Sequence, residues 1–128
     1  PGWILLLALV ACGERAALIG DEALAEAYES RRSDLLVEGR GVVERTLRDD
    51  TKGSRHQRFI LRLSSGQTLL VAHNIDLAER VPLAVGDEVA FRGVYEWNDK
   101  GGVIHCTHSD PRGRRVGGWL EHAGKRYG

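Results

Sequence analysis

Hydrophobic and polar residues alternate along most of the chain after residue 34, with the two-residue period of β-strands. Stretches with this period cover residues 35–47, 55–63, 67–73, 88–97 and 103–107. Residues that favour turns separate them at 49–53, 64–66 and 98–102. We therefore expect five strands, most of them joined as hairpins.

Three other segments have different patterns. Residues 21–32 place Leu24 and Tyr28 four positions apart, with acids at the start and arginines at the end, which predicts a short helix. Residues 75–81, between the third and fourth strands, predict one or two helical turns before Pro82. Residues 119–122 and 125–127 flank an Ala-Gly pair and predict a terminal hairpin.

Three strands, a helical crossover and two further strands follow the order of an OB-fold. We expect a mainly β protein, built as a small OB-fold-like five-stranded barrel with a short helical crossover, an N-terminal helix and a C-terminal hairpin. An SH3-like barrel and a small open sandwich are the alternatives. The size of the chain fits one such domain.

The loop at residues 64–66 sets the register of the second and third strands. If Gly66 takes the left-handed position of a three-residue loop, Leu63 faces Gln67 across the hairpin. Phe59 then faces Val71 in a continuous apolar column. A shift of one residue would break that column.

The same register gathers polar residues at the open end of the hairpin. Gln57 faces His73 there, and His56 faces Asn74. The two histidines are expected on opposite faces, so they need a bend or a strand end to share a ligand.

The register of the second hairpin follows from a similar count around residues 98–102. It pairs Trp97 with Val103 and Tyr95 with His105. Tyr95, Trp97, Trp119 and Tyr127 are the aromatic side chains that we consider as stacking platforms, although core positions are the simpler interpretation.

Residues 105–110 place His105, His108 and Asp110 close together in the sequence. These groups suit metal coordination or proton transfer, and structural histidines are the alternative. A strand would point the two histidines to opposite faces, so a shared metal ion requires the chain to turn at Thr107. Neighbouring strand residues also point apart, so we do not expect Cys106 to form a nucleophile–base pair with His105.

The chain begins with an apolar run from Trp3 to Ala11 that ends at Cys12. The run is too short for the roughly 20 residues of a membrane-spanning helix, but it fits the apolar region of an export signal. Residues 9–12 resemble a bacterial lipobox, which implies cleavage before Cys12 and a lipid anchor on its sulfur. An ordinary cleaved signal and a buried helix are the alternatives.

This interpretation divides the chain into an export signal at 1–11, an anchor and short helix at 12–33, and the barrel domain at 34–128. It places the protein in the bacterial cell envelope, held to the membrane by its lipid anchor, with the domain in the periplasm.

Charge is balanced overall but uneven along the chain. The 18 basic and 18 acidic residues argue against a uniformly basic surface. Residues 40–62 nevertheless carry seven basic and three acidic side chains, and residues 110–128 carry five and two. Both stretches are candidates for contact with a polyanionic ligand, and arginines spread over solvated strand faces are the alternative.

Segments 53–59 (GSRHQRF), 72–78 (AHNIDLA), 95–98 (YEWN) and 101–105 (GGVIH) resemble a family of small exported bacterial proteins, domain of unknown function 3465. The resemblance runs from about Asp34 to Tyr127. It implies an exported or lipid-anchored single domain, and no particular reaction. This chain has Cys106 where the family has tryptophan, and Ser109 where histidine is common. The signature positions carried over are His56, His73, Asn74, His105, His108 and Asp110.

Three functions remain open from the sequence. The first is a binding module for an anionic ligand such as an oligonucleotide or oligosaccharide, which would use Arg45, Arg55, Arg58, Arg62, His56, His73 and Asn74. The second is a hydrolase, of phosphodiesterase or nuclease type, with a divalent metal ion as cofactor on His105, His108 and Asp110 together with His56 or His73. The third is a structural or partner-binding envelope protein. The candidate ligand-binding or catalytic residues are Arg55, His56, Gln57, Arg58, His73, Asn74, Tyr95, Trp97, His105, His108 and Asp110.

Overall fold

The computed structural model describes residues 16–114 and 116–128. The expected signal and Cys12 lie outside these residues. Within them, no helix is long and apolar enough to cross a membrane. In chain order the elements are β1 (Leu18–Ile19), α2 (Asp21–Glu29), β2 (Leu35–Thr46), β3 (His56–Arg62), β4 (Thr68–Asn74), β5 (Glu88–Glu96), β6 (Val103–His105), β7 (Trp119–His122) and β8 (Lys125–Tyr127).

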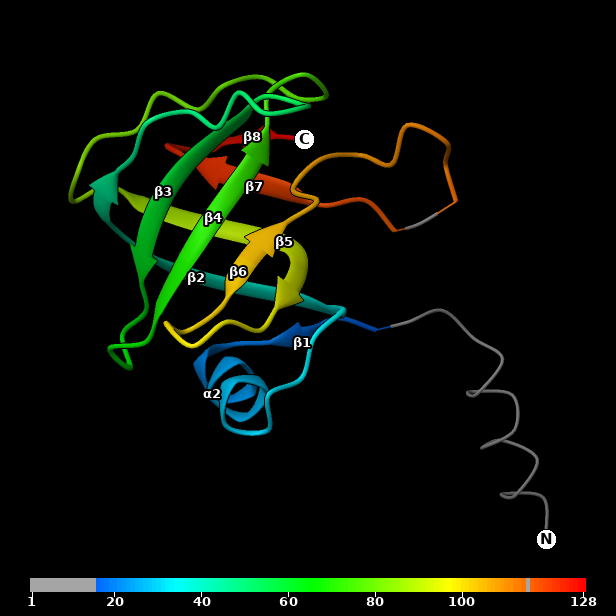
Figure 1. The fold of residues 1–128 in the computed structure, drawn as a ribbon. Helices are drawn as coiled ribbons and strands as arrows, with labels where there is room; N and C mark the ends of the chain where they lie inside the picture. The colour runs from blue at the N-terminus through cyan, green and yellow to red at the C-terminus, as the bar shows by residue number, and fades with distance from the viewer. Residues whose placement is uncertain (1–15, 115) are drawn as a thin grey trace, which may run out of the picture.

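Five of the strands close into a barrel in the order β2-β3-β4-β6-β5, because β2 pairs with both β3 and β5 (Figure 1). The β4–β6 pairing is parallel and the other pairings of the ring are antiparallel. This is a small OB-like barrel, so the predicted fold class is confirmed. β1 adds to β2, and the predicted terminal hairpin, β7 and β8, adds to β5.

The predicted register of the first hairpin is confirmed. The Leu63 amide donates to the Gln67 carbonyl at 2.9 Å, and Gly66 has the left-handed φ of 94°. Phe59 pairs with Val71, and both side chains are fully buried inside the barrel. Apolar packing and turn chemistry specify the same alignment here, which is why the register could be predicted from the sequence.

The predicted register of the second hairpin is wrong by one residue. Tyr95 pairs with Ile104, and His105 pairs with Val94. The Asn98 side chain accepts hydrogen bonds from the amides of Lys100 and Gly102, and this loop takes Trp97 out of the ladder. Tyr95 and Ile104 therefore both point into the core, while His105 lies on the outer face.

The predicted N-terminal helix is confirmed as α2, which packs onto one end of the barrel. Its Leu24 and Ala27 are buried in the main core cluster. The indole nitrogen of Trp97 donates to the Tyr28 carbonyl at 3.0 Å and ties the helix to the end of β5. The helix and the barrel therefore share one core.

The predicted helical crossover is not present. Residues 75–78 form a single turn, in which the Ala78 amide donates to the Asn74 carbonyl at 3.0 Å, and the chain then runs without helix to β5. The Gln57 amide group donates to the Val81 carbonyl at 2.7 Å and accepts from the Val81 amide at 2.9 Å. Because the Gln57 side chain forms hydrogen bonds with the Val81 carbonyl and amide, these backbone groups are not available to a helix.

Candidate functional site on the outer face of β3 and β4

The four polar residues predicted at the open end of the first hairpin do come together, and two of them hold the crossover in place. Gln57 pairs with His73 and His56 pairs with Asn74 across the strands. Gln57 and His73 point inward and are buried. Gln57 binds Val81, as described above, and His73 binds the carbonyl of Glu79 at 2.8 Å. These contacts fix residues 79–81 against the barrel.

His73 has a hydrogen-bond partner on each ring nitrogen. Its Nε2 must donate to the Glu79 carbonyl, which can only accept, so Nδ1 accepts from the Thr107 hydroxyl at 2.7 Å. Burial lowers the pKa of His73, and the charges of His108 and His56 lower it further against the effect of the Glu79 bond. His73 is therefore a neutral core histidine with no nitrogen left for a ligand or a metal ion.

The remaining residues of this end build the exposed loops. The Arg55 backbone amide donates to Asp76 Oδ2 at 2.9 Å and its guanidinium donates to Oδ1 at 2.9 Å, and these two hydrogen bonds lower the pKa of Asp76. Asn74 accepts from the Asp76 amide through its side chain, and His56 Nδ1 lies 2.9 Å from the Ser54 carbonyl. The guanidinium of Arg55 is thus partly engaged within the protein.

Residues 105–110 do not form a shared site. β6 ends at His105, and the chain turns at Cys106 rather than Thr107. Both carboxylate oxygens of Asp110 accept from backbone amides of its own loop, and His108 Nδ1 lies 2.7 Å from a neighbouring carbonyl. Among the described residues, no three His, Cys, Asp or Glu side chains are grouped to hold a metal ion.

The geometry at Cys106 differs from the sequence expectation. Cys106 adopts a left-handed φ of 56°, and this turns its sulfur back toward the preceding residue. Cys106 Sγ lies 3.3 Å from His105 Nδ1, so the two neighbouring side chains do touch.

The outer face of β3 and β4 carries the residues that alternate with the core. We call it the β3–β4 face and define it by Arg58, Ile60, Arg62, Thr68, Leu70 and Ala72. A bulge in β2 between Val43 and Arg45 aligns Arg45 with Ile60, which in turn pairs with Leu70. The bulge therefore brings a cation to the edge of an apolar strip.

A groove of about 430 Å³ lies on this face. Its lining comes from β2 and the start of the β2–β3 loop, from β3 and β4, and from the β5–β6 loop. The lining residues are Glu44, Arg45, Leu47, Ile60, Thr68, Leu70, Asn98, Lys100 and Gly102. The sequence reasoning missed Lys100 and the apolar floor, although the outward positions of Ile60 and Leu70 were readable from the strand period.

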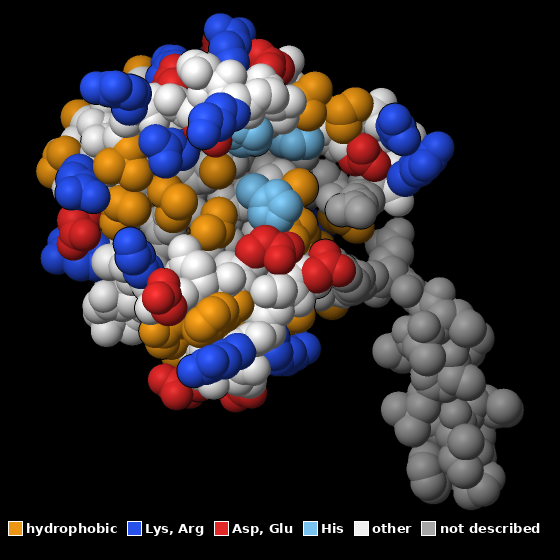
Figure 2. Space-filling view, viewed as in Figure 1, with side chains coloured by type: hydrophobic (Ala, Val, Ile, Leu, Met, Phe, Trp, Pro, Cys, Tyr) orange, Lys and Arg blue, Asp and Glu red, His pale blue; other side chains and the backbone are white. Residues whose placement is uncertain are grey.

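Basic side chains surround the apolar centre of the face, as Figure 2 shows. Arg58 Nε donates to the Arg48 carbonyl at 3.0 Å, which directs this side chain along the face toward the β2–β3 loop. Arg62 lies 4.0 Å from Glu44, a loose contact between two exposed groups. Arg45 and Lys100 line the groove itself, one from β2 and the other from the β5–β6 loop.

Tyr95 and Trp97 serve the core and the helix, Tyr127 is buried, and Trp119 lies under Arg126 on the terminal hairpin. Tyr95 is fully buried and donates to the Gly101 carbonyl, and burial raises its pKa. Trp97 stacks on Tyr28 with ring centroids 6.3 Å apart, and Arg31 Cζ lies 5.0 Å from the centroid of the Trp97 ring. Aromatic rings therefore do not line the groove.

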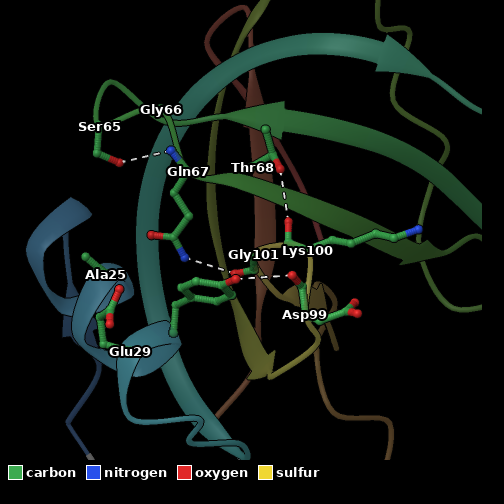
Figure 3. A pocket seen from close by; sticks show the side chains of 10 residues that line it. Ala25, Glu29, Ser65, Gly66, Gln67, Thr68, Asp99, Lys100 and Gly101 are labelled. Carbon is green, nitrogen blue, oxygen red and sulfur yellow. Dashed lines mark hydrogen bonds between the residues drawn. The ribbon is translucent and has the colours of Figure 1, made fainter.

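A second hollow lies between α2 and the loops at the same end of the barrel (Figure 3). It measures about 420 Å³. Several of its polar groups bond within the protein: Gln67 Nε2 donates to the carbonyls of Leu24 and Gly101, and Thr68 Oγ1 donates to the Lys100 carbonyl, whereas the buried Gln67 Oε1 has no partner among the described residues. These bonds join the helix to both hairpin loops, so we assign this hollow a structural role.

The fold and the β3–β4 face define a small OB-like barrel protein with a groove whose rim carries cations. The chain belongs to the family described as protein of unknown function DUF3465, whose sequence profile matches residues 5–128. No curated protein matches the chain at a significant level.

Proposed function

We propose that this protein is a cell-envelope binding module that holds an anionic oligosaccharide or oligonucleotide on the β3–β4 face. The observation that carries the proposal is the groove with Arg45 and Lys100 on its rim and Ile60 and Leu70 on its floor. OB-folds bind such ligands on the face of their second and third strands, between the first and fourth loops. In this barrel those positions are β3, β4 and residues 47–55 and 97–102.

The charge of the face supports an anionic ligand. Arg45, Arg58, Arg62 and Lys100 lie on or beside it, and Glu44 is the acid that lines the groove. Contacts of this kind displace counterions from a polyanion, so the affinity should fall steeply as salt rises. Because base stacking needs aromatic rings and none lines the groove, ionic contacts have to supply most of the affinity.

The lipobox-like segment supports the location. A lipid on Cys12 would hold the barrel at a membrane surface through residues 13–17. The binding face would then act on polymers of the envelope rather than on ligands of the cell interior.

The test is a binding titration with two fluorescent probes, an oligodeoxythymidylate and a sulfated oligosaccharide, at several salt concentrations. For the double variant Arg45→Ala/Lys100→Ala we expect affinity weaker by on the order of ten-fold, and a salt slope shallower by about 1.4 for the single-stranded probe. Arg112→Ala is the matched control, because this arginine is exposed in the loop after β6. Equal losses in the control and the double variant would refute the assignment of the groove.

We do not propose the hydrolase alternative. That alternative required His105, His108 and Asp110 to share an ion with His56 or His73. In the structure the Asp110 carboxylate accepts hydrogen bonds from amides of its own loop, and both ring nitrogens of the buried His73 are hydrogen-bonded.

A further inference from the structure

Cys106, His105 and Glu96 form a line of three polar side chains on β5, β6 and the residue after β6. Cys106 Sγ lies 3.3 Å from His105 Nδ1, and His105 Nε2 lies 3.4 Å from Glu96 Oε1. The second contact is longer than a typical hydrogen bond, but its donor and acceptor face each other. The function proposed above uses none of these residues.

The order of the groups is that of a nucleophile, its base and the group that orients the base. The Glu96 carboxylate can only accept, so it favours the histidine tautomer with the proton on Nε2. Nδ1 is then free of a proton and faces the thiol. The hydrogen bond with Cys106, together with Glu96, raises the pKa of His105 against the effect of burial. Each of these contacts stabilises an imidazolium beside the sulfur.

The three side chains are also reachable. His105 and Glu96 are 37% and 40% exposed, and Cys106 is half-buried. The left-handed turn at Cys106 explains how neighbours in the sequence can pair: with an extended backbone their side chains would point to opposite faces.

We propose that Cys106 is a base-assisted nucleophilic thiol that exchanges with small disulfides and becomes a covalent modification site. The thiol proton passes to His105 Nδ1, and the sulfur attacks one sulfur of a small disulfide. The disulfide bond breaks while the bond from Cys106 to that sulfur forms. The other half leaves as a thiolate and takes the proton from the imidazolium. Cys106 is the one cysteine in the part of the chain that the structure describes, so the mixed disulfide persists there until an external thiol reduces it.

The test is the rate at which Cys106 of the full chain reacts with glutathione disulfide and with iodoacetamide, resolved from Cys12 by peptide mass spectrometry. An unassisted thiol is only a few per cent ionised at pH 7, so loss of the base in His105→Gln should slow both reactions by roughly ten-fold. Glu96→Gln should slow them by a smaller factor. His122→Gln removes a second histidine–carboxylate pair, with Asp87, and should leave the rate unchanged.

Two further readouts separate chemistry from folding. The rates of wild type and His105→Gln should converge at pH 9.5, where thiols ionise without help. Native Cys106 should also react faster at pH 7 than the same cysteine in urea-unfolded chain, a comparison that needs no variant. Equal rates for wild type and folded His105→Gln at pH 7, or a native rate below the unfolded one, would overturn the proposal.

Discussion

Replacing His73 with leucine tests whether this histidine is a structural element of the barrel. Leucine fills the site with an apolar side chain and removes both hydrogen bonds, to the Glu79 carbonyl and from the Thr107 hydroxyl. Both His73 and Thr107 are fully buried, so water cannot replace the lost partner of the hydroxyl without a rearrangement.

The expected cost follows from these two bonds. Each contributes about 1 kcal/mol, and a buried group left without a partner adds about 1–3 kcal/mol, so His73→Leu should lower the free energy of unfolding by at least about 3 kcal/mol. With a urea m-value of about 1.5 kcal/mol/M, the unfolding midpoint would fall by at least about 2 M. This loss is a large fraction of the stability of a typical domain.

The assay is urea unfolding followed by circular dichroism. His56→Leu is the control, because its ring bonds one carbonyl at the edge of an exposed loop, and we expect it to lose less than about 1 kcal/mol. A Thr107→Val variant completes a double-mutant cycle, in which a coupling of about 1 kcal/mol is expected. A His73→Leu protein as stable as wild type, or with no coupling to Thr107, would refute the structural role.

Three other predictions follow from the same structure. Burial lowers the pKa of His73 below the 6.5 of an unfolded histidine, so the unfolded chain gains a proton first as pH falls. The stability advantage of wild type over His73→Leu, measured by urea unfolding, should therefore be complete above pH 6.5 and shrink toward pH 5. A constant difference between the two proteins would contradict this. Gly102→Ala places a methyl group 2.2 Å from the Tyr95 ring at a φ of 119°, and should lower the free energy of unfolding by about 3 kcal/mol or more in the same assay. Gly53→Ala, where a methyl group meets open space, should lower it by about 1 kcal/mol. Equal losses would argue against the packing of Tyr95 on Gly102. Cys12→Ser should move the protein from the membrane pellet to the soluble fraction on cell fractionation, and retention in the pellet would contradict the lipid anchor.

The elements most readable from the sequence are those where two signals coincide. In the first hairpin, the apolar column of Phe59 and Val71 and the turn at Gly66 specify the same register. In the second hairpin, the loop length depends on the Asn98 side chain and on the fit of Tyr95 against Gly102, and neither is visible in a count of residues.

The crossover between β4 and β5 could not be predicted from its local hydrophobic pattern. Residues 75–81 have a helical distribution of apolar side chains, yet the Gln57 side chain, 24 residues before Val81, and the His73 side chain, at the end of β4, bind their backbone. Tertiary hydrogen bonds therefore override the local preference. The sequence correctly grouped these polar residues, but it could not show that they face the core.

The candidate site was only partly predictable for a related reason. Arg58 and Arg62 follow from the strand period, whereas Lys100 reaches the groove through the β5–β6 loop and Arg45 through a bulge. The pair of Cys106 and His105 depends on one left-handed backbone angle at a residue that is not glycine. No sequence rule used for strands anticipates that angle.

The central claim is that the β3–β4 face is the binding surface. The most direct measurement is amide chemical-shift mapping of the isotope-labelled protein during titration with the sulfated oligosaccharide or the oligodeoxythymidylate. We expect shifts concentrated on β3, β4 and residues 97–102, which disappear at high salt. Shifts confined to α2 or to the loop at 108–114, or saturating binding with no shift on β3 and β4, would contradict it.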